Sequence, residues 1–282
     1  MTSSMNTILV IGGTSGIGQA FVQRFHKMGK KLIVTGRRQA RLDELKSSLS
    51  GLETYAMDNT DLASLPKHVE TLTRQYSDID TVWVNGGIQT AFSIKDPNSS
   101  TDKSVINEID TNVTAPVVLA RHFIPFLLST GSEANFMITT SGLAFIPIPS
   151  YPVYCATKAF VHHFLVGMRQ SLAGTNVNVI EIAPPRVETE LDTAHKAVSN
   201  SGPPSISVQD FTDKTFEILD NGKASELKEV AVGFAQNGVS AWRGGIGAYD
   251  VVDRSRPAYA MISPMDALLP SYKLLFFAAS RA

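Results

Sequence analysis

A tyrosine and a lysine stand four positions apart in the stretch SYPVYCATKAF, residues 150–160. Residues with this spacing are neighbours on one face of a helix, so Tyr154 and Lys158 could act on one small molecule. An ammonium beside a phenol stabilises the phenolate and lowers the phenol pKa from ~10 toward neutrality, where the group can donate and accept protons. The same pair also occurs by chance on amphipathic helices, so a catalytic function depends on what the rest of the chain supplies.

A glycine-rich turn follows the first apolar run of the chain. The motif GGTSGIG places Gly12, Gly16 and Gly18 between the run TILVI and the helical pattern IGQAFVQRF. Glycines let the backbone turn sharply and approach a pyrophosphate, and a helix N-terminus offers unpaired N–H groups and a positive dipole. The position between a strand and a helix predicts a nucleotide site rather than a plain tight turn.

The second apolar run ends in VTGRRQARL, at the point that separates the two nicotinamide dinucleotides. An enzyme that uses NAD usually has an acid here for the ribose hydroxyls, whereas an arginine accommodates a 2′-phosphate. Gly36 takes the place of the acid, and Arg37 and Arg38 supply positive charge. One of the two arginines can be an ordinary solvated loop residue, and the pair favours NADP(H) over NAD(H).

Further motifs follow in a fixed order. They are Asp58 in AMDNTD, VNGG at 84–87, Asn112 in IDTNVTAP, Ser141 in TTSGLA, and Tyr154 with Lys158 thirteen residues after that serine. With IGGTSGIG, this order resembles the short-chain dehydrogenase/reductase family in its single-domain branch. The resemblance covers about 1–190 well and 190–235 loosely, and APPRVET resembles the family's P-G-x-V-x-T.

The resemblance implies a set of site residues. The catalytic residues would be Asn112, Ser141, Tyr154 and Lys158. The cofactor contacts would be Gly12, Thr14, Ser15, Gly16, Ile17, Gly18, Arg37, Arg38, Asp58, Asn85, Gly87, Tyr154, Lys158, Val187 and Thr189. Tyr154 would transfer the proton on the carbonyl oxygen, Ser141 would hold that oxygen, and Asn112 would organise a water that supplies protons through Lys158.

The leading hypothesis is therefore an NADPH-dependent carbonyl reductase, or the reverse alcohol oxidation, with a mostly apolar ketone as the small-molecule substrate. The apolar stretch LAFIPIPSYP lies between the catalytic serine and tyrosine, so Phe145, Ile146, Pro147 and Tyr151 are expected to border the pocket unless they form only a tight loop. Pro185 replaces the family's glycine and removes an N–H, which leaves open a non-redox step such as cyclisation or isomerisation. A non-catalytic NADP(H)-binding regulator is a third alternative, which the intact catalytic set argues against.

Short runs rich in Ile, Val and Leu alternate with longer helical patterns, which indicates βαβ units. Strands are expected at about 7–11, 31–35, 53–57, 80–84, 135–139, 177–182 and 229–232. Helices are expected at 17–28, 38–49, 66–76, 103–128 and 152–173. This pattern predicts an α/β fold with a doubly wound, seven-stranded parallel sheet (a Rossmann fold) in three αβα layers, as a single domain over 1–282.

Two regions depart from this alternation. The polar segment at about 190–228 is long for a connection, so a lid over the substrate is expected there. The extension at about 244–282 contains an apolar run far short of the ~20 residues that span a bilayer. It is expected to pack on the body or on a second subunit, and the protein to form a homo-oligomer, a dimer or tetramer.

Composition excludes several classes of function. The formal net charge of −1 leaves no basic surplus for nucleic acid. The single cysteine, Cys155, has no disulfide partner within the chain, and the N-terminal apolar run lacks the charged region of a signal peptide, so a cytoplasmic protein without a membrane span is expected. No metal site is expected, because His122, His162 and His163 lie in helices without carboxylate or cysteine neighbours at ligand spacing.

Overall fold

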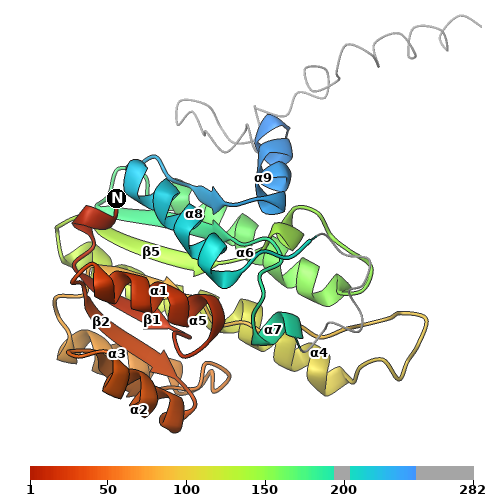
Figure 1. Cartoon of the computed structure of the whole chain (residues 1–282), viewed down its shortest axis with the longest axis horizontal. Helices are drawn as coiled ribbons and strands as arrows, with labels where there is room; N and C mark the ends of the chain where they lie inside the picture. Colours follow the sequence, from red (N-terminus) through yellow and green to blue (C-terminus); the bar gives the residue numbers. More distant parts are fainter. Residues whose placement is uncertain (194–203, 246–282) are drawn as a thin grey trace, which may run out of the picture.

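A seven-stranded parallel sheet forms the centre of the protein (Figure 1). The computed structural model describes residues 1–193 and 204–245. The strand order is β3-β2-β1-β4-β5-β6-β7, with parallel pairing throughout. The strands are β1 (Thr7–Ile11), β2 (Lys31–Gly36), β3 (Glu53–Ala56), β4 (Thr81–Val84), β5 (Ala134–Thr139), β6 (Val177–Ala183) and β7 (Glu229–Ala231). The predicted fold is confirmed, and each predicted strand lies within one residue of its expected bounds.

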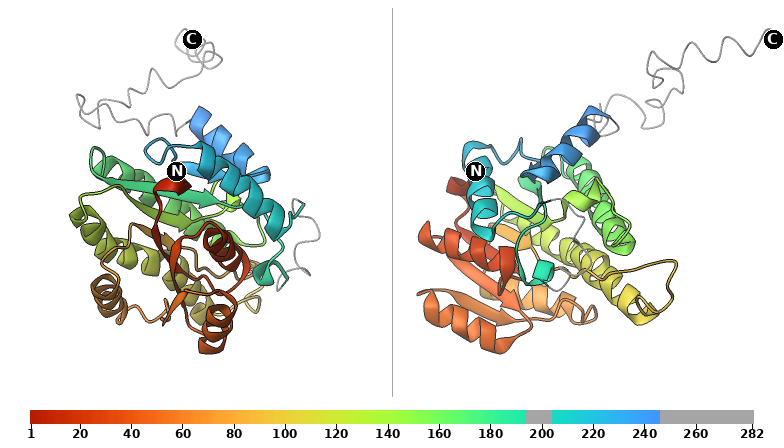
Figure 2. Two further views of the ribbon diagram at one scale, coloured as in Figure 1. Left: turned by 60° about the vertical axis from the view of Figure 1, so that its left-hand side comes forward. Right: turned by 45° about the vertical axis from the view of Figure 1, so that its right-hand side comes forward.

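Helices cover both faces of this sheet. They are α1 (Gly16–Lys27), α2 (Gln39–Ser48), α3 (Leu65–Gln75), α4 (Asp102–Ile109), α5 (Ala115–Ser129), α6 (Pro152–Ser171), α7 (Glu190–Thr193), α8 (Val208–Asn221) and α9 (Phe234–Gly244). Three short helical turns complete the set: η1 (Thr2–Ser4), the π-helical η2 (Asp110–Thr114) and η3 (Gly142–Ala144). One hydrophobic core lies between the sheet and α1, α2 and α8, and a second lies between the sheet and α3, α5 and α6 (Figure 2). The central strands β1, β4 and β5 are buried along their whole length, as their continuous apolar sequences predict.

The helix expected over 103–128 is interrupted by a π turn. α4 ends at Ile109, η2 follows, and α5 begins at Ala115. π turns inside α-helices are frequent at functional sites, and this one contains Asn112. By length and composition the whole stretch Asp102–Ser129 is also a candidate membrane span. Its apolar character has another cause in the fold, because Leu119, Phe123 and Leu127 of α5 are fully buried in the second core.

The segment expected as a lid contains a core helix. Phe211, Phe216 and Leu219 of α8 are fully buried, and the Phe211 and Phe216 rings pack against Phe21 of α1 at centroid distances of 5.8 and 5.1 Å. Residues 208–221 therefore belong to the body of the protein. The rest of the expected lid comprises 190–207 and 222–228, of which 194–203 lie outside the described residues. The C-terminal extension lies almost entirely outside them as well.

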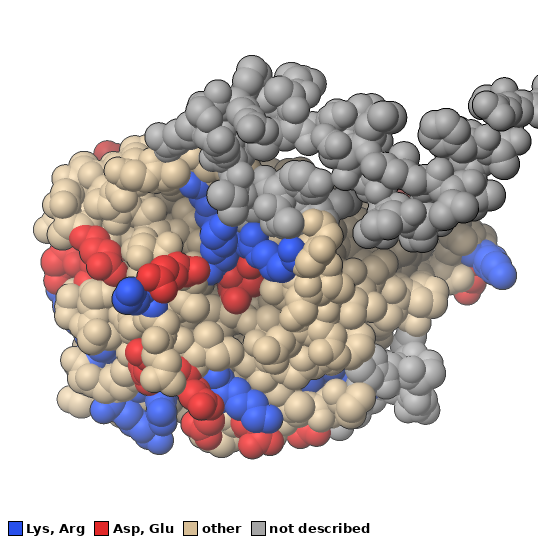
Figure 3. Space-filling view, turned by 90° about the horizontal axis from the view of Figure 1, so that it is seen from above, with Lys and Arg blue, Asp and Glu red and all other residues tan. Residues whose placement is uncertain are grey.

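Acidic and basic side chains alternate over the face of the described residues that Figure 3 shows. This mixture agrees with the net charge of −1. The visible face therefore offers no extended basic surface of the kind that a nucleic-acid backbone requires.

Candidate active site

A cavity of about 370 Å³ opens at the carboxyl ends of the strands. Its wall is built from the segments that follow β1, β2, β3, β4, β5 and β6 and from the first turn of α7. Ligands of doubly wound sheets bind at this edge, where the strand order reverses between β1 and β4.

Glycines bring the turn after β1 against the turn after β4. Gly12 has φ +86°, and a Cβ on it would lie 2.7 Å from the backbone nitrogen of Gly86. Gly16, with φ +52°, begins α1, and its N-cap Ser15 makes no side-chain capping bond. The first-turn N–H groups of α1 are therefore open to an anion, and Ser15, Gly16 and Ile17 line the cavity.

Gly18 has a packing function instead of lining the cavity. A Cβ there would lie 2.6 Å from Nδ2 of Asn85 and would also collide with the carbonyl oxygen of Gly12. Asn85 Nδ2 donates to that same carbonyl at 3.1 Å, and its Oδ1 accepts from Thr139 Oγ1 at 2.9 Å. One side chain thus joins the ends of β1, β4 and β5.

Positive charge lies at the end of β2, as expected. Arg37 and Arg38 both line the cavity and are exposed. Gly36 has no room for a side chain, because a Cβ would lie 2.7 Å from Cγ2 of Thr14. An acidic side chain at position 36 would collide with Thr14, so the ribose-binding acid of NAD enzymes does not fit here.

The first residue of α7 neutralises part of this charge. Glu190 forms ion pairs with Arg41 at 2.7 Å and with Arg38 at 3.8 Å. All three side chains are substantially exposed, which keeps these pairs weak.

Asp58 also lines the cavity. Burial acts to raise its pKa, but hydrogen bonds from Thr60 N and Oγ1, at 2.9 and 2.8 Å, and the nearby Arg37 together hold the pKa below its usual value. Asp58 is therefore a charged acceptor next to the arginine pair.

Ser141, Tyr154 and Lys158 converge on the cavity from β5 and α6. Ser141 caps η3 by accepting from Leu143 N at 3.1 Å, and it shares a side-chain hydrogen bond with Tyr154. Burial raises the pKa of Tyr154 above its ordinary value, the bond to Ser141 works against this, and Glu108 adds to the rise. This direction is opposite to the one expected from a neighbouring lysine, because the phenol is only 7% exposed and loses its hydration.

Lys158 contributes to the cavity wall, but only 4% of its surface is exposed. Its Nζ donates to the carbonyl oxygen of Thr139 at 3.0 Å and lies 5.6 Å from the centroid of the Tyr154 ring. Burial lowers the pKa of Lys158 to about 8, while Glu108 and Glu181 act to raise it.

Asn112 lies behind the wall and does not line the cavity. Its side chain accepts from Ile88 N at 2.9 Å and donates to Ile88 O at 2.8 Å, so it holds the segment after β4 in place. A Cβ on Gly87 would lie 3.2 Å from Asn112 Oδ1 and 3.3 Å from Lys158 Nζ. The expected residues Gly87, Asn112 and Lys158 therefore meet at one point.

Sequence reasoning missed Glu108, which is one helical turn before Asn112. Its side chain is 1% exposed, and Oε1 accepts from Thr90 N at 3.2 Å. Burial raises its pKa to about 7, although the bonds from Thr90 and the charge of Lys158 act against the rise. The signal in the sequence was the spacing of four between Glu108 and Asn112.

The substrate side of the cavity differs from expectation in part. Tyr151 lines it as predicted, together with Leu143 and Ile148. Phe145 and Ile146 instead pack on α9, where a Cβ on Gly238 would lie 2.8 Å from Cβ of Phe145. Among the described residues, neither of them nor Pro147 contributes to the wall, because η3 turns this part of the loop toward α9.

The segment after β6 closes the cavity from the other side. Pro185, Val187 and Thr189 line it, as does Arg186, whose Nε donates to Asp192 Oδ1 at 2.5 Å. The methyl of Thr189 would lie 3.3 Å from a Cβ on Gly16, so this segment covers the glycine-rich turn.

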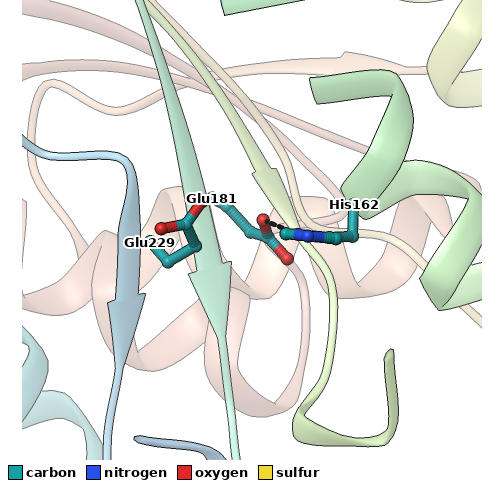
Figure 4. Close-up of side chains that lie close together, drawn as sticks. All are labelled: His162, Glu181 and Glu229. Atoms are coloured by element: carbon teal, nitrogen blue, oxygen red, sulfur yellow. Dashed lines mark hydrogen bonds and ion pairs between the residues drawn. The ribbon is translucent and has the colours of Figure 1, made fainter. Parts of the chain in front are cut away.

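A second polar cluster joins α6, β6 and β7, and it corrects the expectation that His162 has no carboxylate neighbour (Figure 4). His162 Nδ1 and Glu181 Oε2 are 2.7 Å apart, and Thr140 Oγ1 donates to Glu181 Oε1 at 2.5 Å. Glu229 is bound by two guanidiniums, Arg169 at 2.8 Å and Arg243 at 2.7 Å. Ligand atoms of His162, Glu181 and Glu229 lie within 4.8 Å of one another, but the two arginines already balance the two carboxylates. This arrangement is a structural network and does not favour a cation.

Comparison with known proteins agrees with this geometry. The family model of the short chain dehydrogenases matches residues 6–199. The uncharacterized oxidoreductase DltE of Bacillus subtilis (strain 168) is 35% identical over 231 residues, which cover 81% of this chain and 90% of that protein. Serine 3-dehydrogenase of Rhizobium radiobacter is 36% identical over 186 residues, covering 65% and 73%.

A solved structure of a serine dehydrogenase in its closed form, complexed with NADP+, superposes with a TM-score of 0.70 at 26% identity, covering 80% of this chain and 94% of that one. The family model extends over more than half of the chain, and the expected Ser141, Tyr154 and Lys158 meet at one cavity. The predicted resemblance is confirmed: this chain belongs to the short-chain dehydrogenases, a family of oxidoreductases.

Proposed function

We propose that this protein is an NADPH-dependent reductase of carbonyl groups that also oxidises the corresponding secondary alcohols. One observation carries the proposal: the hydrogen-bonded Ser141 and Tyr154 line the same cavity as the glycine-rich turn and the arginine pair. A proton-transfer pair and a dinucleotide cradle in one cavity support hydride transfer to a carbonyl.

The residues of the cavity fit a dinucleotide with a 2′-phosphate. Side chains are missing at Gly12 and Gly36, where a Cβ would collide with backbone or with Thr14. The open N-terminus of α1 suits a pyrophosphate. Arg37 and Arg38 suit a 2′-phosphate, and the serine dehydrogenase that this chain resembles was crystallised with NADP+.

Bound NADPH supplies the hydride for the carbonyl carbon. Ser141 holds the carbonyl oxygen by a hydrogen bond, and Tyr154 gives that oxygen the proton of its hydroxyl. Lys158, next to the tyrosine ring, stabilises the phenolate that remains and returns a proton to it. Asn112 holds the segment carrying Gly87, so that Lys158 keeps its place.

The substrate proposed is a carbonyl compound with a mostly apolar body. Leu143, Ile148, Tyr151 and Phe234 give this side of the cavity apolar surface. Arg186 and Asp192 at the same cavity give it a polar margin. The size of the apolar part relative to that margin decides which ketones fit.

The test follows cofactor absorbance with purified protein and a panel of substrates. The panel contains alkyl and aryl ketones with NADPH and, in the reverse direction, secondary alcohols and L-serine with NADP+. Steady oxidation of NADPH with apolar ketones, abolished in Tyr154→Phe, is the expected result. Activity with L-serine and with no other substrate of the panel would contradict the proposed apolar substrate. It would still agree with an oxidoreductase.

Two other results would contradict the proposal as a whole, and a third would contradict only the preference for NADPH. Product formed without a change in cofactor absorbance would favour the non-redox alternative. Tight NADPH binding without turnover of any substrate on the panel would favour the regulator. Equal affinity for NADPH and NADH would contradict the cofactor preference.

The partner proposed is a second copy of the same chain. Among the described residues, apolar side chains are exposed on α4, α5 and α6: Ile106 (59%), Ile109 (41%), Leu128 (36%) and Phe160 (51%). Such side chains on neighbouring helices support a protein interface.

A further inference from the structure

Glu108 is a buried carboxylate beside the catalytic residues. Its side chain is 1% exposed, and its hydrogen bonds come from Thr90, whose N–H donates to Oε1 at 3.2 Å. Burying a carboxylate is costly unless a positive charge or several donors compensate it. Neutral donors from one residue compensate a buried charge only weakly, and burial still raises the pKa of Glu108 to about 7, so the position needs a further reason.

Lys158 presents the complementary problem. Its side chain is 4% exposed, and Nζ donates to one carbonyl, that of Thr139 at 3.0 Å. A buried ammonium loses its proton readily unless a negative charge acts on it. The groups that act on Lys158 are Glu108 on α4 and Glu181 on β6, with the phenol of Tyr154 on its own helix.

Glu181 is already committed to other partners. It accepts from Thr140 at 2.5 Å, pairs with His162 at 2.7 Å, and lies 3.7 Å from a guanidinium nitrogen of Arg169. The arginine offsets the charge of Glu181 within that cluster. Among the residues that the structure describes, the cation that acts on Glu108 is Lys158 itself, so the charge of Glu108 is not offset by an arginine.

The fold places Glu108 and Lys158 on either side of one loop. Glu108 binds Thr90 and Asn112 binds Ile88, so two side chains one helical turn apart hold consecutive parts of the segment after β4. Gly87 in the same segment leaves the space in which Asn112 Oδ1 and Lys158 Nζ approach. α4 and α6 pack against each other around it.

We propose that Glu108 is the counter-ion of Lys158, a positioning residue that keeps the lysine charged over the pH range in which the enzyme binds NADP(H) and turns over. This inference rests on the proposed function for its catalytic consequence only. The charge coupling itself belongs to the two side chains and can be measured without a substrate.

The sign of the effect follows from the charges. A carboxylate near an ammonium favours the protonated lysine and raises its pKa, opposing the effect of burial. Without the carboxylate, Lys158 loses its proton at lower pH. The contact of Lys158 with the cofactor and its support of the Tyr154 phenolate are then lost at lower pH as well.

The experiment compares wild type with Glu108→Gln, which keeps an oxygen that can accept from Thr90 N and removes the charge. NADPH affinity is titrated from pH 6 to pH 10 without substrate, and kcat/KM is measured over the same range. We expect the alkaline loss of both quantities to move to lower pH by about one unit, the lower end of the range for a nearby opposite charge. Glu108→Asp, which keeps the charge, should restore most of the wild-type profile.

Two further variants separate electrostatics from structure. Asp110→Asn removes the same charge from the adjoining π turn and should leave the profile in place. In a Lys158→Arg background, where the cation cannot lose its proton, Glu108→Gln should produce no displacement.

Superimposable affinity profiles for wild type and Glu108→Gln would overturn the inference. So would a uniform loss of affinity at every pH, because that pattern indicates a purely structural role. If no carbonyl substrate is reduced but the affinity profile moves, the proposed function fails and the counter-ion stands.

Discussion

The phenol of Tyr154, the proposed proton donor, lies in surroundings that oppose its ionisation. Tyr154 is 7% exposed, and burial and Glu108 both raise its pKa. A tyrosine with a raised pKa stays protonated at neutral pH, so its proton is available to a developing alkoxide, but it is a weaker acid than a free phenol. Ser141 and Lys158 then matter because they stabilise the phenolate when the proton has left.

Replacing Tyr154 by phenylalanine tests this at the smallest scale. The ring and its packing stay, so NADPH affinity should remain near that of wild type. Turnover should fall by at least ~10²-fold, the lower range for loss of a positioned general acid. Titration of NADPH and single-turnover kinetics on both proteins measure the two quantities, and a variant that reduces ketone at the wild-type rate would remove Tyr154 from the mechanism.

Glu108 gives the apo-protein a characteristic dependence of stability on pH. Its pKa in the folded state, about 7, lies above the ordinary value of 4.5. The folded protein therefore binds the extra proton between these values, and the stability that this proton contributes is present below pH 4.5 and lost as pH rises through 7. Glu108→Gln lacks this dependence.

Between pH 4.5 and 7.5, wild type should therefore lose roughly 1–3 kcal/mol in its free energy of unfolding relative to Glu108→Gln. Urea denaturation of both proteins measures this difference. A constant difference over this range would mean that Glu108 is ionised in the folded state throughout.

The meeting of most proposed site residues at the cavity could be predicted from their spacing along the chain. Ser141, Tyr154 and Lys158 lie on two consecutive elements, and the sequence interval between them fixes their meeting point. Glu108 and the pairing of His162 with Glu181 could not be predicted in this way. A buried glutamate looks like a surface residue in a sequence, and His162 meets Glu181 only because α6 packs on β6.

At the scale of elements, the two turns after β1 and β4 act as one unit. Gly12 touches Gly86, and Asn85 binds the carbonyl of Gly12. The distance between these two turns sets how closely the backbone approaches a pyrophosphate. A side chain on Gly12 would push the turns apart.

A matched pair of alanine variants measures this contact. Gly12→Ala meets backbone at 2.7 Å and needs φ +86°, which is unfavourable for a side chain. It should lower NADPH affinity at least ~10-fold and stability by about 1–3 kcal/mol. Gly86→Ala meets only the end of the Asn59 side chain at 3.0 Å, which can move, so that variant should bind within a few-fold of wild type. Equal affinities in the two variants would contradict the argument.

The elements themselves were predictable to different degrees. Strands buried along their whole length, such as β1, β4 and β5, have continuous apolar runs, which is why they could be placed. α8 was missed because its apolar face is narrow, with Phe211, Phe216 and Leu219 set among charged residues. The π turn at Asn112 was missed because one extra residue in a turn leaves the helical patterns on either side of DTNVT intact.

At the scale of the whole molecule, one layer of helices carries exposed apolar side chains and the other carries α8 and the chain's amino-terminal turn. Phe160 on α6 is 51% exposed, although the neighbouring Val161 is fully buried. An aromatic ring left in water costs solubility unless another surface covers it. The surface proposed to bury Phe160 is that of a second copy of the chain.

Sedimentation of the wild-type protein should give a mass two or four times that of the 30.5 kDa chain. Phe160→Asp should shift the distribution toward the single chain, because burying a carboxylate in an apolar interface is unfavourable. The substitution of an exposed residue on another face, Lys46→Asp, serves as the control. A wild-type protein that sediments as one chain at micromolar concentration would contradict the interface.

We expect the ion pairs of Glu190 with Arg38 and Arg41 to make the binding of a 2′-phosphate an exchange of anions. A 2′-phosphate that reaches these guanidiniums displaces a carboxylate already present, so the released α7 and the bound phosphate are thermodynamically linked. Glu190→Gln removes the competitor. NADPH affinity should therefore rise several-fold in the variant and depend more steeply on salt, whereas NADH affinity should not change. In the protein without cofactor, the Glu190 carboxylate thus forms with the arginines the weak ion pairs that the 2′-phosphate is proposed to replace.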